Sequence, residues 1–248
     1  MTQEKEPRRR FLRQIFAIVP ATTLGGGVAL GETACTSTSD SGSSSGSASA
    51  TGKVASDYEP TYFTTAEYAF LNAAVDHLIP SDKFGAGALE TNVPQFLDKQ
   101  METPYGHGQL WYMQGPFHTD LDATLGYQMN LTPRQIYRHG IAECNSWCQQ
   151  NHQKAFADVD PSIQLSVLKD LEGGKIQFEA LPAKTFFAYL LKNTKEGYFA
   201  DPIYGGNKDM GGWKMVGFPG ARADYADWID QHNVKYPYGP VSISGRKA

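Results

Sequence analysis

The sequence is poor in cysteine and lacks the motifs of several well-known enzyme folds. It has three cysteines among 248 residues, and no Cys-x-x-Cys-His to which haem c could be attached covalently. No Gly-x-Gly-x-x-Gly follows a strand-like run, and neither a P-loop nor a Gly-x-Ser-x-Gly motif occurs. These absences argue against a dinucleotide-binding fold, a P-loop NTPase and an α/β-hydrolase.

The nearest approach to a metal-binding pattern is the spacing of Cys144, Cys148 and His152. On one continuous helix the first and last of these would lie about 12 Å apart, whereas zinc ligands lie about 2.0–2.3 Å from a shared ion. The spacing therefore predicts no metal site. We favour burial of both cysteines or an intersubunit disulfide over a strained bridge between them, because positions i and i+4 of a helix are poorly aimed for a disulfide.

Positive charge is concentrated at the N-terminus. The formal net charge is −4. Residues 1–13 carry five basic and two acidic side chains, or +3, and residues 14–31 carry no charge, so the chain from Glu32 onward carries −7. No basic stripe appears later in the chain, which argues against a nucleic-acid partner.

A long hydrophobic run is also lacking. The apolar stretch from Ile15 to Leu30 has 16 residues and contains Pro20, whereas a membrane-spanning helix needs about 20 apolar residues. The stretch follows a basic segment, which is typical of an export signal over residues 1–31. The residues Arg8, Arg9, Phe11 and Leu12 match a twin-arginine motif, with Pro7 where serine or threonine is usual. The alternative is an ordinary secretory signal.

Residues 32–57 are interpreted as a flexible linker. The part from 36 to 52 is almost entirely Ser, Thr, Gly and Ala, which offers too little apolar surface to offset the entropy of ordering. Cys35 stands at the head of this tract, where a lipid-anchored cysteine would stand, although Glu32 occupies a position where a lipobox favours leucine. Lipidation of Cys35 and cleavage after Gly31 are therefore both left open.

The remaining residues, 58–248, predict a single compact all-α domain. Five stretches show apolar residues at helical spacing together with start and stop signals. Thr64 with Glu67 forms a predicted capping box, and Thr132 followed by Pro133 is a second predicted start. The predicted helices cover 63–80, 93–101, 131–153, 160–174 and 181–197. Long irregular segments connect or follow them at 102–130 and 198–240.

Two stretches of this domain resemble the gluconate 2-dehydrogenase subunit 3 family. They are FLNAAVDHLIPSDKFGAGALETNVPQFLDKQM (70–101) and GYFADPIYGGNKDMGGWKMVGFPG (197–220). The family comprises the small, or gamma, subunits of membrane-bound, FAD-dependent sugar and sugar-acid dehydrogenases. The resemblance implies a chain without catalytic residues or cofactor of its own, bound to a large FAD-containing subunit. A multi-haem cytochrome c subunit is a further implied partner.

The same resemblance implies that this chain helps the flavoprotein mature and supplies its export signal through the twin-arginine translocase. The complex is then expected in the periplasm, associated with the inner membrane. The alternative is an autonomous exported binding protein or lipoprotein without a dehydrogenase partner.

The second stretch is rich in glycine and aromatic residues, with seven glycines and five aromatics in 24 residues. A glycine-rich backbone permits close approach, and aromatic side chains are enriched at interfaces. We expect this stretch to contact the large subunit; the other interpretation is that it folds back over its own helices. The predicted contact residues are Tyr198, Phe199, Asp201, Tyr204, Gly205, Gly206, Asn207, Trp213, Gly217, Phe218, Pro219 and Gly220.

Overall fold

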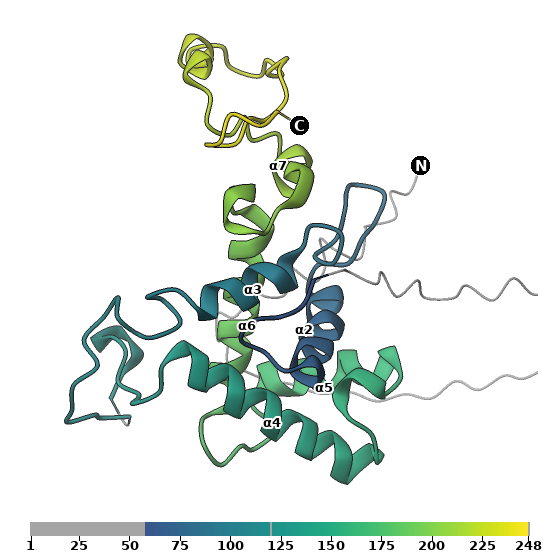
Figure 1. The fold of residues 1–248 in the computed structure, drawn as a ribbon, viewed down its shortest axis with the longest axis vertical. Helices are drawn as coiled ribbons and strands as arrows, with labels where there is room; N and C mark the ends of the chain where they lie inside the picture. The colour runs from purple at the N-terminus through teal and green to yellow at the C-terminus, as the bar shows by residue number, and fades with distance from the viewer. Residues whose placement is uncertain (1–57, 120, 248) are drawn as a thin grey trace, which may run out of the picture. The chain divides into compact units, whose positions relative to one another are not determined.

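The structure is a computed structural model and describes residues 58–119 and 121–247. The predicted export signal, the linker and Cys35 lie outside these residues. The described residues contain six α-helices, short 3₁₀ turns and only isolated β-bridges, which confirms the all-α prediction (Figure 1). The α-helices are α2 (Thr65–Leu78), α3 (Val93–Met101), α4 (Pro133–His152), α5 (Pro161–Gly173), α6 (Ala183–Phe199) and α7 (Gly211–Val216).

The helix starts follow from local chemistry. The Thr64 side chain accepts a hydrogen bond from the backbone N–H of Glu67, whose carboxylate in turn accepts one from the backbone N–H of Thr64. Thr132 and Gln135 make the same reciprocal pair at the start of α4. Both capping boxes satisfy backbone donors that the first turn would otherwise leave unpaired. The predicted boundaries of the five helices agree with α2 to α6 within about two residues.

Helix α6 is the centre of the core, because it contacts α2, α3, α4, α5 and α7. In Figure 1 it lies among α2, α3 and α5. Phe70, Phe156 and Phe186 are buried together, with the ring centroids of Phe70 and Phe156 4.5 Å apart. Helix α4 approaches closely at Gly140, where a Cβ atom would stand only 2.2 Å from the ring of Phe186. Glycine is therefore required at that crossing.

The buried carboxylate of Asp98 on α3 holds the segment that enters the domain. It accepts hydrogen bonds from the hydroxyls of Tyr58 and Thr61 and from the backbone N–H groups of residues 61 to 63, at 2.7–3.0 Å. Burial alone would raise the pKa of Asp98, but these hydrogen bonds outweigh it and lower that pKa. One side chain thus fixes the path of residues 58–63 across the helical body.

The prediction that residues 198–240 are irregular throughout is wrong in part. Helix α6 continues to Phe199, and α7 forms over Gly211–Val216. The buried side chain of Asn207 explains this turn of the chain: its amide donates to the carbonyl of Ala200, and its oxygen accepts from the N–H of Gly212 at the start of α7. The glycine-rich composition concealed a helix that depends on this link.

Candidate functional site

The structure brings together the two stretches that lie far apart in the sequence. The Tyr198 hydroxyl on α6 donates to the carbonyl of Ala86 at 2.7 Å, and the Lys208 N–H donates to the carbonyl of Thr91 at 3.0 Å. Helix α3 also packs along α6. Residues 70–101 and 197–216 therefore form one structural unit at the end of α6 that carries α7 (Figure 1).

Three glycines of this unit permit close contacts within the chain itself. A Cβ atom on Gly197 would stand 2.7 Å from the ring of Phe96, one on Gly206 would stand 2.3 Å from the carbonyl oxygen of Gly197, and one on Gly212 would stand 2.2 Å from that of Tyr198. No side chain fits at such distances. The glycines therefore allow the segment to fold back over its own helices, one of the two interpretations of the sequence.

Two of the aromatic residues in the segment are buried supports. Tyr198 is fully buried, and Trp213 is buried with its indole N–H donating to the carbonyl of Phe199 at 2.8 Å. Each carries a more exposed ring on its surface: Phe199 stacks edge-on against Tyr198 at 5.0 Å, and Phe218 stacks edge-on against Trp213 at 5.2 Å. The exposed rings of Phe199 and Phe218 are therefore held in place by buried side chains.

Exposed apolar side chains occur on α7, at the end of α6 and on the turns that contact them. Met215 links two parts of this group, since it lies 3.6 Å from the position of a Cβ atom on Gly85 and its sulfur lies 3.6 Å from the Tyr198 hydroxyl. We call the group the α7 surface. Its exposed members are Phe84, Phe199, Ile203, Tyr204, Met215, Val216 and Phe218.

The residues predicted to contact a partner fall into two groups. Buried within the chain are Tyr198, Asp201, Gly206, Asn207 and Trp213; fully or partly exposed are Phe199, Tyr204, Gly205, Gly217, Phe218, Pro219 and Gly220. Only the second group is available for contact in this structure. Sequence reasoning missed Phe84, Ile203, Met215 and Val216. A search for aliphatic as well as aromatic side chains would have found three of these, but only the fold brings Gly85, the neighbour of Phe84, against Met215.

Asp201 holds the end of the described chain against this unit. Its carboxylate accepts hydrogen bonds from the N–H of Ile203, the hydroxyl of Ser242 and the N–H of Ile243, at 2.8–3.0 Å. Burial opposes the charged form, but these hydrogen bonds lower the pKa of Asp201 below its ordinary value. The arrangement resembles that of Asp98, in which a carboxylate also fixes a distant segment.

Cys144 and Cys148 are both fully buried on α4 and are not joined in a disulfide. The Cys144 thiol hydrogen-bonds to Cys148, and together with burial this contact raises the pKa of Cys144. An intersubunit disulfide, which stays a prediction, would first have to expose one of the two thiols.

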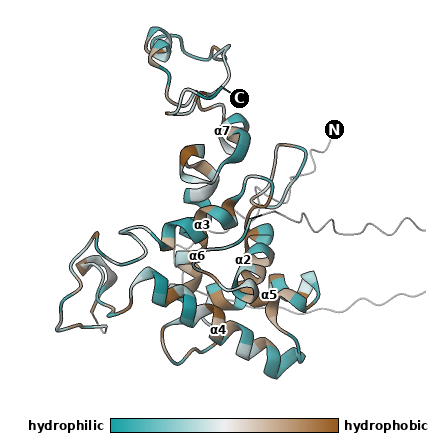
Figure 2. Cartoon of the chain, in the orientation of Figure 1, coloured by the Kyte–Doolittle hydropathy of each residue, from teal (hydrophilic) through white to brown (hydrophobic). Residues whose placement is uncertain are grey.

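Among the residues that the structure describes, no group of three or more His, Cys, Asp or Glu side chains is placed to hold a metal ion. The irregular segment between α3 and α4 carries exposed hydrophobic residues (Figure 2). It surrounds an open hollow of about 400 Å³, lined by Trp111, Tyr112, Phe117 and Tyr127 among others, and no charged side chain lines it.

Among the helices that the structure describes, none combines the length and the apolar character required to cross a membrane.

Comparison with known proteins gives one informative result. Searches among curated proteins and among solved structures returned no match. The model of the family described as gluconate 2-dehydrogenase subunit 3 matches residues 65–220. That range is more than half of the chain and spans α2 to α7 with all of the α7 surface. The chain therefore belongs to the gluconate 2-dehydrogenase subunit 3 family and is a small subunit of that kind of dehydrogenase complex.

Proposed function

We propose that this chain is the non-catalytic gamma subunit of a membrane-associated, FAD-dependent gluconate or sugar dehydrogenase, and that it binds the catalytic flavoprotein subunit through the α7 surface. The observation that carries the proposal is the exposed apolar group around α7, which lies within the region that matches the family. Single exposed apolar residues are ordinary, but a group of them on a fixed support is typical of a protein–protein contact.

The α7 surface is suited to binding because it is preorganised. Phe199 and Phe218 each rest on a buried ring, and both buried rings are held by hydrogen bonds of 2.7–2.8 Å to backbone carbonyls. Little side-chain freedom is then lost when a partner covers them, and the unfavourable entropy of association is correspondingly smaller. We expect Phe199, Tyr204 and Phe218 to be the main anchors of the interface.

The remaining parts of the proposal concern the complex rather than this chain. Oxidation of a sugar or sugar acid would take place at the FAD of the large subunit, and a multi-haem cytochrome c subunit would receive the electrons. The twin-arginine signal with Arg8 and Arg9 would export this chain together with the folded flavoprotein. The complex would then function in the periplasm at the inner membrane.

The test of the proposal is affinity purification of the tagged full-length chain from native membranes, followed by an absorbance spectrum. A stoichiometric large partner with flavin bands is expected, and a haem Soret band would add the cytochrome. A colourless chain without a partner would instead support an autonomous exported binding protein or lipoprotein.

Export is tested separately with the variant Arg8→Lys/Arg9→Lys. We expect both this chain and its flavoprotein to remain in the cytoplasm, because the translocase requires the arginine pair. A flavoprotein that still reaches the periplasm would remove the escort role and leave the binding role intact.

A further inference from the structure

Residues 221–240 form a loop whose two ends are tied together. The N–H of Ala221 donates to the carbonyl of Val241 at 2.7 Å, and the N–H of Val241 donates to the carbonyl of Pro219 at 3.1 Å. Directly after the loop, the hydrogen bonds from Ser242 and Ile243 to Asp201 attach the returning chain to the end of α6. The loop therefore begins and ends at one place, beside the α7 surface.

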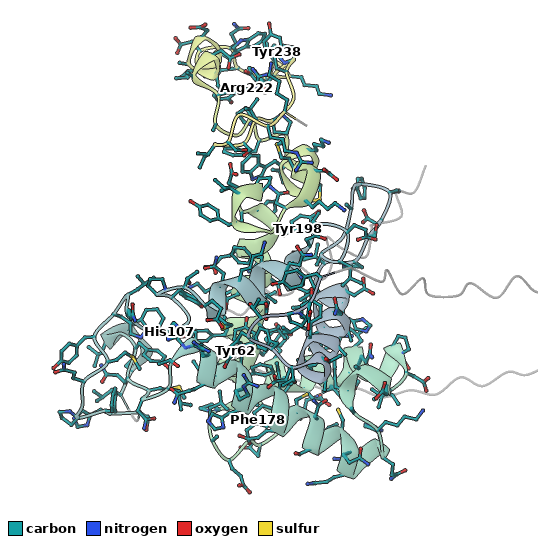
Figure 3. All side chains as sticks on the ribbon, viewed as in Figure 1. Tyr62, His107, Phe178, Tyr198, Arg222 and Tyr238 are labelled. Atoms are coloured by element: carbon teal, nitrogen blue, oxygen red, sulfur yellow. The ribbon has the colours of Figure 1, made fainter. Side chains whose placement is uncertain are left out.

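The loop carries a cluster of aromatic side chains that contact one another. The guanidinium of Arg222 donates to the carbonyl of Gly239 at 2.9 Å, pairs with Asp224 at 2.8 Å and stacks over Tyr238 at 5.1 Å. Arg222 and Tyr238 lie together in this loop in Figure 3. Tyr225, Trp228 and Tyr238 each make an edge-on contact with Tyr236 at 5.0–5.6 Å. Compact loops with joined ends that are packed by their own side chains are frequently functional.

The outer surface of the loop is both apolar and acidic. Ile229 is 66% exposed, and Val234 and Tyr238 are each 54% exposed. The loop contains Asp224, Asp227 and Asp230 against Arg222 and Lys235, and Arg222 pairs with Asp224, so Asp227 and Asp230 give it a net negative charge. Ordering some 20 residues costs much conformational entropy, and the loop covers almost none of the helical core in return. The ordered loop instead holds its exposed side chains in fixed positions.

Resting on the proposed function, we infer that the 221–240 loop is a second docking element for the flavoprotein subunit, and that it fits an apolar recess with a basic rim on that subunit. The loop follows directly from Phe218 in the α7 surface, so one partner can cover both. It lies beyond residues 65–220, which match the family, and it therefore serves recognition of this chain's own flavoprotein.

The charge pattern argues against two other occupants. An anionic lipid surface would repel Asp227 and Asp230. A second copy of this chain is also a poor partner, because the chain from Glu32 onward carries a net charge of −7. Complementary charge across an interface favours a basic surface and speeds the encounter.

The experiment is a competition in native cells between tagged full-length chains and the untagged wild type, read out as flavin retained per tagged chain. The variant Asp227→Lys/Asp230→Lys reverses two exposed charges of the loop. The control variant Asp158→Lys/Glu179→Lys makes the same charge change at two exposed positions of the helical body. We expect the loop variant to retain at least about tenfold less flavin than the wild type at low salt, with a smaller salt dependence, while the control matches the wild type.

The outcomes separate this inference from the proposed function. If the wild-type chain retains no flavoprotein, the proposed function itself fails. If the wild type and the loop variant retain flavin equally, or if the control loses as much as the loop variant, the loop inference fails and the proposed function stands. Loss of vesicle binding or of self-association in the loop variant, with flavin retention unchanged, would assign the loop to another partner. Circular dichroism and thermal melts check that the loop variant is folded.

Discussion

The carboxylate of Asp201 accepts a hydrogen bond of 2.9 Å from the hydroxyl of Ser242, which lies 41 residues further along the chain. Its other oxygen accepts the N–H of Ile243 at 2.8 Å. This carboxylate therefore joins the end of α6, which carries the α7 surface, to the base of the 221–240 loop. The two docking elements proposed above depend on the same side chain for their relative position.

Replacing Asp201 by asparagine should release the loop without unfolding the helices. The side-chain NH2 of asparagine cannot accept a hydrogen bond, so one of the backbone N–H groups that Asp201 binds would lose its acceptor. An unpaired buried donor costs about 1–3 kcal/mol. Limited proteolysis should then cut within residues 221–240, while the helical circular dichroism stays unchanged. The matched control is Asp209→Asn, because Asp209 is exposed and pairs with the exposed Arg246. Equal protection of the loop in both variants would contradict this role of Asp201.

Asp98 should make the stability of the domain depend on pH in the acid range. Its pKa is lowered in the folded state from an ordinary value of 3.8, so its contribution is fully present above about pH 4 and is lost as pH falls through the folded pKa. Asp98→Asn should lower the free energy of unfolding by about 2–4 kcal/mol near neutral pH. The difference from wild type in thermal melts should shrink below pH 4. A difference that does not change with pH would show that charge is not the cause.

Gly212→Ala should displace α7 from α6. The added methyl group would stand 2.2 Å from the backbone oxygen of Tyr198, which cannot rotate away, and overpacking of this kind costs about 1–3 kcal/mol. Flavoprotein binding should weaken with little change in helix content. Gly173→Ala is the control, since its methyl group would meet only the Lys175 side chain at 3.7 Å. A Gly212→Ala chain that binds and melts like the Gly173→Ala chain would argue against the close contact.

Phe218 and Trp213 should differ in what they affect. Phe218→Ala removes an exposed ring, so the melting temperature should stay nearly constant while flavoprotein binding weakens by about 1–3 kcal/mol. Trp213→Ala removes a buried ring and should lower stability by about 3–5 kcal/mol as well. Tyr112→Ala, at an exposed position in the segment between α3 and α4, controls for loss of an aromatic ring elsewhere. Unchanged binding in Phe218→Ala would move the interface away from the α7 surface.

The two buried cysteines should be inert towards thiol reagents. In a Cys35→Ser background, which removes the third cysteine, the native chain should react slowly, and two thiols per chain should react after denaturation. Burial shields both thiols, and the raised pKa of Cys144 further reduces its thiolate. The hydrogen bond with Cys144 lowers the pKa of Cys148, so burial is what protects that thiol. Rapid labelling of the native chain would show that α4 opens, and would reopen the question of an intersubunit disulfide.

The helical body could be read from the sequence because its signals are local. The capping boxes at Thr64 and Thr132 involve residues three positions apart, and the apolar spacing of the five predicted helices reports a burial pattern within single helices. The two stretches that resemble the family lie within the region that the family model matches. Local geometry and composition were sufficient for the helix predictions.

The tertiary structure alone decided which residues of the 197–220 stretch face solvent. Tyr198 and Phe199 are neighbours in the sequence, yet Tyr198 is buried and Phe199 is 41% exposed, because the Tyr198 side chain packs towards the 79–92 segment, where its hydroxyl donates to the carbonyl of Ala86. The carboxylates of Asp98 and Asp201 likewise pair with groups 35 to 42 residues away. Such contacts depend on how helices meet, and no periodicity within one segment records them.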